Sequence, residues 1–191
     1  GEYVPFTGNM SGMLIAEYIM RERKATNTMP ENPALVKTIV TTNLADQMTK
    51  EYGVKLIEVL TGFKFIGEQI KWFEETGSNN YVFGLEESYG CLPGTYARDK
   101  DAPAAVVMLC EVAAYYKAKN MTLWDGMIEM YEKYGYYKEG ITTLTLKGID
   151  GAAQINAIMT KAREESPVKV GEYEVLYAID YKNDTRKNVK T

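Results

Sequence analysis

The residues best suited to chemistry form a short acidic segment, Glu86-Glu87-Ser88, which follows the apolar run 81–85. Two carboxylates placed after a buried strand are costly unless they face solvent or polar partners. Neighbouring residues of an extended segment point to opposite sides, so Glu86 is expected to share a face with Ser88. A carboxylate accepts hydrogen bonds from vicinal sugar hydroxyls, and the serine adds a further bond. The pattern fits sugar binding, and it fits a solvated acidic loop equally well.

Two further segments carry groups that suit an oxygen-rich ligand. Thr61-Gly62 precedes a helical pattern, where a hydroxyl and free backbone N–H groups suit a phosphate or sugar oxygen, although such pairs are also common structural caps. The Arg-Asp-Lys-Asp segment 98–101 offers two groups for a phosphate. Lys100 could bind it as a point charge, and Arg98 could bind it through two parallel hydrogen bonds of its guanidinium. The alternative is an exposed loop whose Asp101 caps the next helix. The two aspartates lack a third ligand and make a poor metal site.

Composition excludes several classes of function. The chain has 191 residues, a net charge of −4 and no histidine, which excludes serine–histidine and cysteine–histidine catalysis and histidine zinc sites within these residues. The charge balance favours neither nucleic acid nor an anionic membrane as a partner. No apolar run reaches the length of a bilayer span. Cys91 and Cys110 lack metal or redox spacing, and free thiols in a reducing cytoplasm are the simplest interpretation.

The elements that must position these residues alternate between strand and helix. This alternation predicts an α/β fold, a three-layer α/β/α sandwich with a mixed, mostly parallel sheet. Thr61, Asp101 and Thr122 are the expected N-caps, the last in a capping box with Asp125. The helix at 102–119 is apolar nearly all round and is expected to lie deep against the sheet. The predicted strands are residues 35–41, 54–60 and 81–85.

A shorter segment follows and predicts a partial α+β unit. We expect strands at 141–146 and 173–179 and a helix at 151–165. The polar tail at 182–188 is expected to be mobile or to be a cut linker. The unit is too small for a confident core of its own. Because the chain begins abruptly and without methionine, we expect it to be a piece of a longer protein.

Taken in order, the motifs resemble the third domain of the α-D-phosphohexomutases, and within that family the bacterial phosphoglucomutases and phosphomannomutases. The resemblance implies that residues 1–138 form domain III and that residues 139–191 form the truncated beginning of domain IV. The motifs that carry it are Thr7-Gly8-Asn9, Thr61-Gly62-Phe63-Lys64, Gly84-Leu85-Glu86-Glu87-Ser88-Tyr89-Gly90, Arg98-Asp99-Lys100-Asp101-Ala102 and Glu139-Gly140-Ile141-Thr142-Thr143.

This resemblance implies an isomerase of carbohydrate metabolism that interconverts glucose 1-phosphate and glucose 6-phosphate. The family works through a bisphosphate intermediate, here glucose 1,6-bisphosphate, and uses a phosphoserine and Mg²⁺. In the family, the Glu-x-Ser loop binds the sugar hydroxyls, the Thr-Gly turn lines the sugar site and the lysines approach the substrate. The implied substrate-binding residues are Glu86, Ser88, Thr61, Gly62, Lys100 and Lys64.

The family's phosphoserine, metal and C-terminal phosphate loops do not occur in these residues. The chain therefore contributes no catalytic residue and no metal ligand, and we expect it to be inactive without the remaining domains of a cytoplasmic enzyme. Phosphomannomutase or phosphopentomutase specificity on the same scaffold is an alternative. A non-catalytic carbohydrate-binding module is another. A glycosidase is disfavoured because Glu86 and Glu87 are sequence neighbours and cannot straddle one bond.

Overall fold

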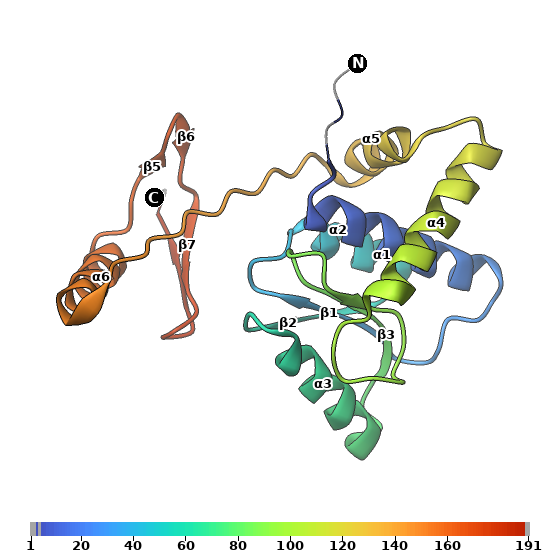
Figure 1. The fold of residues 1–191 in the computed structure, drawn as a ribbon, viewed down its shortest axis with the longest axis horizontal. Helices are drawn as coiled ribbons and strands as arrows, with labels where there is room; N and C mark the ends of the chain where they lie inside the picture. The colour runs from blue at the N-terminus through green and yellow to red at the C-terminus, as the bar shows by residue number, and fades with distance from the viewer. Residues whose placement is uncertain (1–2, 4, 190–191) are drawn as a thin grey trace. The chain divides into compact units, whose positions relative to one another are not determined.

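The computed structural model describes residue 3 and residues 5–189 of the chain. The chain divides into two compact units, Gly1–Glu139 and Gly140–Thr191. The first unit carries a sheet with helices on both faces, and the second carries a helix and two short antiparallel ladders (Figure 1). Within the described residues, no helix is both long and apolar enough to cross a membrane.

The first unit alternates helices and strands, as the sequence predicts. Its strands are β1 (Pro33–Thr38), β2 (Lys55–Val59), β3 (Asn80–Leu85) and β4 (Cys91–Leu92). Its helices are α1 (Gly8–Ala25), α2 (Leu44–Tyr52), α3 (Phe63–Thr76), α4 (Ala102–Ala118) and α5 (Leu123–Tyr134). The predicted caps at Asp101 and Thr122 are confirmed: Asp101 accepts from the Ala104 N–H, and Thr122 forms a capping box with Asp125.

The sheet has the strand order β2-β1-β3-β4. β1 pairs in parallel with both β2 and β3, and only β4 runs antiparallel to its neighbour, so the prediction of a mixed, mostly parallel sheet is confirmed. β1 and β3 are buried almost throughout, because helices cover both faces of the sheet. β1 and β2 are shorter than predicted, whereas β3 begins one residue earlier than predicted, at Asn80. β1 ends at Thr38 because the chain then turns and the Thr41 N–H donates to the Thr38 carbonyl at 3.0 Å.

Two apolar clusters lie on opposite faces of the sheet. Leu35, Val82 and Phe83 belong to the larger cluster, which α1, α2, α4 and α5 complete. Val36 belongs to the smaller cluster, which α3 completes on the other side. Figure 1 shows the resulting layers, with α1 and α2 on one side of the strands and α3 on the other.

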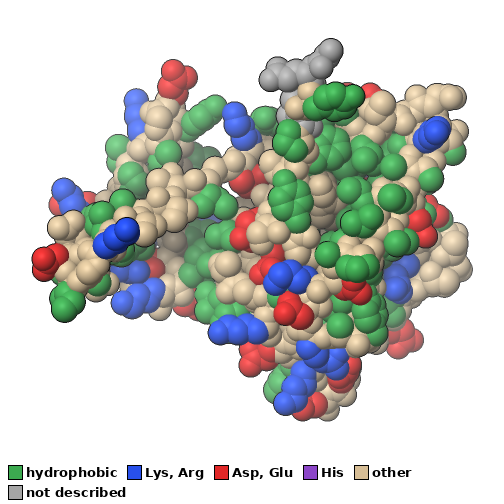
Figure 2. Space-filling model, in the orientation of Figure 1, with side chains coloured by type: hydrophobic (Ala, Val, Ile, Leu, Met, Phe, Trp, Pro, Cys, Tyr) green, Lys and Arg blue, Asp and Glu red, His purple; other side chains and the backbone are tan. Residues whose placement is uncertain are grey.

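The prediction that α4 lies deep against the sheet is wrong. Only Val112 and Tyr116 of this helix are buried, whereas Val106 and Val107 are 62% and 59% exposed. The reason is that α4 packs chiefly against α1, α5 and the end of the sheet at β4, so it covers the first helix layer instead of the strands. Hydrophobic side chains therefore gather over α4 on the surface (Figure 2).

The second unit differs from its predicted pattern in three places. It contains α6 (Gly148–Glu164), β5 (Lys169–Val170), β6 (Tyr173–Glu174), β7 (Tyr177–Asp180) and β8 (Thr185–Asn188). Residues 141–146 form no strand, because β-prone residues need a partner strand and the described part of this unit offers them none. The predicted strand at 173–179 is split between two ladders, and the predicted mobile tail contributes β8, which pairs with β7.

Candidate functional site

The loops that follow β1, β2 and β3 meet at one edge of the sheet. These three strands are parallel, so their carboxyl ends lie side by side, the usual place for a ligand in an open α/β sheet. The loop after β3 carries the predicted acidic residues, and the loop after β2 carries Thr61 and Gly62. The fold therefore positions two of the three predicted segments at the same edge.

The acidic loop is a tight turn anchored at both ends. The Glu86 N–H donates to the Gly90 carbonyl at 2.8 Å, which closes the turn. Tyr89 adopts a φ of 67° and its hydroxyl donates to the Phe6 carbonyl at 2.7 Å, which ties the loop to the segment before α1. Ser88 lies exposed on the outside of this turn.

The two neighbouring glutamates have different surroundings. Glu86 is 5% exposed, and its Oε2 lies 3.7 Å from the Lys100 ammonium. Glu87 instead accepts a hydrogen bond from the Thr38 hydroxyl at 2.9 Å. A side chain at Gly90 would collide with both Glu86 and Lys100, because its Cβ would lie 2.8 Å from each. Glycine at this position therefore allows the buried carboxylate and the lysine to approach each other.

Lys100 links the acidic loop to the start of α3. Its ammonium lies 3.3 Å from an Asp99 carboxylate oxygen and 5.6 Å from the centre of the Phe63 ring, and its side chain is half-exposed. Phe63 is the first residue of α3, directly after the Thr61-Gly62 pair. Lys100 therefore lies next to Glu86 on one side and next to Phe63, the residue after the Thr61-Gly62 turn, on the other.

The prediction that Thr61 caps α3 is wrong. Gly62 is the N-cap of α3, with a φ of 119° that favours glycine, and no side chain caps this helix end. Thr61 itself is exposed. Lys64 is also exposed and lies over the Phe65 ring at 4.9 Å, with no hydrogen bond or ion pair to the acidic loop among the described residues.

The rest of the 98–101 segment has a structural role. Arg98 forms an ion pair with Glu74 at 2.5 Å and donates to the carbonyl of Thr95 at 2.7 Å. Asp101 caps α4, and the Ala104 N–H together with the Tyr96 hydroxyl lowers the pKa of its carboxyl. Of the two interpretations of this segment, the helix cap is therefore confirmed for Asp101.

A hollow of about 290 Å³ lies beside Glu86, between α1 and α4. Its walls include small or apolar residues such as Gly12, Ile15, Ala105 and Leu109. Such walls offer few partners for hydroxyls or phosphate. The polar side of Glu86, toward Lys100, suits an oxygen-rich ligand better.

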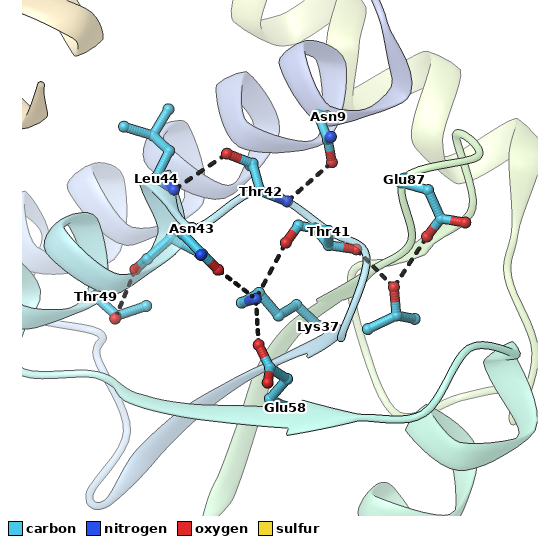
Figure 3. Close-up of polar contacts among 11 residues, drawn as sticks. Asn9, Lys37, Thr41, Thr42, Asn43, Leu44, Thr49, Glu58 and Glu87 are labelled. Carbon is cyan, nitrogen blue, oxygen red and sulfur yellow. Dashed lines mark hydrogen bonds and ion pairs between the residues drawn. The ribbon is translucent and has the colours of Figure 1, made fainter. Parts of the chain in front are cut away.

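The sequence interpretation missed a buried polar network behind the acidic loop. Lys37 is fully buried in β1 and forms an ion pair with Glu58 of β2 at 2.6 Å (Figure 3). A lysine in an otherwise apolar strand, with a glutamate in register on the next strand, is the signal that could have revealed this pair.

Comparison with known proteins identifies the family. Residues 7–134 match the family model described as phosphoglucomutase/phosphomannomutase, alpha/beta/alpha domain III. The chain belongs to this family. The predicted resemblance to the phosphohexomutases and to their third domain is thereby confirmed.

Individual relatives agree with this assignment. The chain is 32% identical over 181 residues to phosphoglucomutases of Staphylococcus aureus strains bovine RF122 / ET3-1 and USA300, which covers 95% of this chain and 32% of each relative. It thus spans about a third of the length of these phosphoglucomutases.

Solved structures of the family share the fold. A putative phosphomannomutase from Thermus thermophilus has a TM-score of 0.54 at 24% identity, over 68% of this chain and 26% of that one. The phosphoglucomutase parafusin from Paramecium, in its open form, has a TM-score of 0.58 at 20% identity, over 96% of this chain and 31% of that one.

The residues that the structure describes do not fit the Mg²⁺ that phosphohexomutases use. Among the described residues, no group of three or more aspartate, glutamate, cysteine or histidine side chains could hold a metal ion. Asp99 and Asp101 do not converge on a shared site, because Asp101 caps α4 and Asp99 accepts a hydrogen bond from the Lys100 N–H. No chemical step of this chain is therefore assigned to a metal.

Proposed function

We propose that this chain is the sugar-recognition part of an α-phosphoglucomutase, which interconverts glucose 1-phosphate and glucose 6-phosphate through glucose 1,6-bisphosphate. The observation that carries the proposal is the state of Glu86. The residue is 5% exposed, yet its carboxylate accepts no hydrogen bond from the described residues, and its one ion pair among them is with the Lys100 ammonium at 3.7 Å. Buried carboxylates normally accept hydrogen bonds, so this one is suited to the hydroxyls of a sugar.

The residues around Glu86 supply complementary contacts. Ser88 is exposed at the turn and binds a further hydroxyl. Lys100 attracts the phosphate of the substrate. The uncapped start of α3, after Thr61 and Gly62, presents free N–H groups and the positive end of the helix dipole. Lys64, in the first turn of α3, adds positive charge to this rim.

Catalysis requires parts that these residues do not include. The phosphoserine loop, the Mg²⁺ loop and the further phosphate contacts belong to the rest of the enzyme, and residues 139–191 form the beginning of its fourth domain. Phosphoryl transfer depends on charges positioned around the moving group, so this chain binds substrate but does not turn it over. The free thiols of Cys91 and Cys110 suit an enzyme of the cytoplasm.

The proposal is tested by titrating the ¹⁵N-labelled chain with glucose 1-phosphate and following its amide shifts by NMR. We expect a dissociation constant of about 1 mM or weaker, about −4 kcal/mol, because much of the intact substrate site is supplied elsewhere. Glu86→Gln and Ser88→Ala each weaken binding at least about threefold. The first removes the negative charge and one acceptor oxygen, and the second removes a hydroxyl. Glu68→Gln is the matched control, because Glu68 is an exposed carboxylate on α3.

Parallel titrations separate the alternatives. Mannose 1-phosphate and ribose 1-phosphate are expected to bind more weakly than glucose 1-phosphate, and tighter binding of either would favour the corresponding mutase. Binding of free glucose as tightly as its phosphate would favour a carbohydrate-binding module. Shifts centred away from Thr61, Glu86 and Lys100 would reject the site.

A further inference from the structure

Lys37 is a costly residue at its position. Its side chain is fully buried in the central strand β1, where an ammonium must be paired and hydrogen-bonded to be tolerated. It donates to the Glu58 carboxylate at 2.6 Å, to the Thr41 carbonyl at 3.1 Å and to Asn43 Oδ1 at 3.3 Å. All the donor capacity of the ammonium is therefore directed at β2 and at the turn that follows β1 (Figure 3).

The turn held by Lys37 continues to the acidic loop. The Thr38 hydroxyl donates to Glu87 Oε2 at 2.9 Å and lies 2.8 Å from the Thr41 hydroxyl. A hydroxyl has a single proton, so Thr38 must accept from Thr41 while it donates to Glu87. The hydrogen bonds thus run in one direction, from Thr41 through Thr38 to the carboxylate of Glu87.

A second contact fixes the same turn from α1. The Thr42 N–H donates to Asn9 Oδ1 at 3.2 Å, and the Leu44 N–H donates to the Thr42 hydroxyl at 3.1 Å (Figure 3). The turn is thereby held on one side by Lys37 and on the other by Asn9, so it offers Glu87 a rigid partner.

We propose that Lys37 is a positioning residue which, through Thr41 and Thr38, holds Glu87 and thereby orients the loop that carries Glu86 and Ser88. The importance of this orientation for sugar binding rests on the proposed function. The neighbouring glutamates then have separate tasks: Glu87 anchors the loop to the sheet, and Glu86 is left for the ligand. An anchored loop needs less ordering when the ligand binds, which favours affinity.

The first test breaks the chain of hydrogen bonds with Thr38→Val, which keeps the side chain's shape and removes its hydroxyl. The readout without ligand is hydrogen exchange of the Glu86 amide, which is bonded to the Gly90 carbonyl. We expect it to exchange about tenfold faster relative to the Val36 amide of the core, the effect of losing one hydrogen bond to a charged group. The dissociation constant for glucose 1-phosphate rises at least about threefold, and Thr38→Ser restores both values.

The second test is Lys37→Met, which fills the same space without the ammonium. We expect the same acceleration at the Glu86 amide. Lys55→Met is its matched control, because Lys55 lies on the adjacent strand β2, is exposed, and should leave the loop unchanged. If Lys37→Met does not fold, Thr41→Val removes the intermediate hydroxyl and decides the point.

The outcomes separate this proposal from the proposed function. If all variants lower the unfolding temperature but leave the relative exchange of the Glu86 amide unchanged, Lys37 is merely structural and the positioning role is wrong. If the wild-type chain does not bind glucose 1-phosphate but the exchange results are as expected, the anchoring of the loop holds and the assigned ligand is wrong.

Discussion

The two units of this chain use similar local patterns with different results. In residues 1–139, strands and helices enclose apolar clusters on both faces of a sheet. In the described part of residues 140–191, a helix and four short strands form, yet only Gly151 is buried. Apolar side chains are present there too, but Ile149 is 90% and Tyr173 77% exposed. Secondary structure alone therefore does not produce a core, which needs a second layer against which to pack.

The largest difference between the two units should appear when each is produced as a separate polypeptide and its thermal unfolding is measured. A polypeptide of residues 1–139 should unfold in one cooperative thermal transition, because its core is self-contained. A polypeptide of residues 140–191 should show no cooperative transition, because about 50 residues without a buried cluster cannot offset the entropy of ordering the chain. Circular dichroism and calorimetry of both polypeptides check this expectation. A sharp transition in the shorter one would show that it has a core of its own.

A smaller difference should appear when one large apolar residue of each unit is replaced by alanine and the loss in free energy of unfolding is compared. Phe83 is fully buried in β3, whereas Leu176 is 52% exposed in the second unit. We expect Phe83→Ala to lower the free energy of unfolding by about 3–5 kcal/mol and Leu176→Ala by less than about 0.5 kcal/mol. Urea denaturation of the full chain, followed by tryptophan fluorescence and circular dichroism, measures both. Equal losses would contradict the difference in packing.

The smallest difference between the units concerns the stabilisation of a helix by its N-cap, and this stabilisation depends on pH. Asp101 caps α4, whereas Lys147, the N-cap residue of α6, makes no side-chain capping hydrogen bond. Backbone and hydroxyl donors lower the pKa of Asp101 below its usual 3.8. Its stabilising effect is therefore complete above pH 3.8 and is lost as the pH falls through the lower folded-state value.

The pH prediction is measured as the difference in unfolding temperature between the wild type and Asp101→Asn, from about pH 6 to about pH 2. Taking the difference cancels the other titrating acids, including Asp99 and Asp125, whose pKa values are also lowered by hydrogen bonds. The wild type should be the more stable at the higher pH, and the difference should shrink below the usual aspartate range. A constant difference would mean that the charge of Asp101 does not contribute.

Much of the fold was predictable because its signals are local. The caps at Asp101 and Thr122 depend on residues a few positions away, and the alternation of strands and helices depends on short-range patterns. The position of α4 was not predictable in the same way. Its apolar sequence fits a helix against a sheet and equally a helix that covers other helices, and only the packing distinguishes them.

The candidate site was predictable by residue type but not by contact. Glu86, Ser88 and Lys100 stand out in the sequence, and the role of each in sugar binding remains a proposal. The bond between Thr38 and Glu87 joins residues 49 positions apart, so no local pattern could indicate it. Lys37 stands out as a lysine in an apolar strand, but its partner Glu58 lies on another strand and is identified only by the pairing register of β1 with β2.

The sequence by itself determined the strands and helices of the first unit, the acidic loop and the family resemblance, since these follow from the order and types of neighbouring residues. The tertiary structure decided that Glu87 contacts the sheet while Glu86 lies beside Lys100. The physical reason is that hydrogen bonds act over about 3 Å. The parallel pairing of β1 with β3 brings the ends of distant segments within that range.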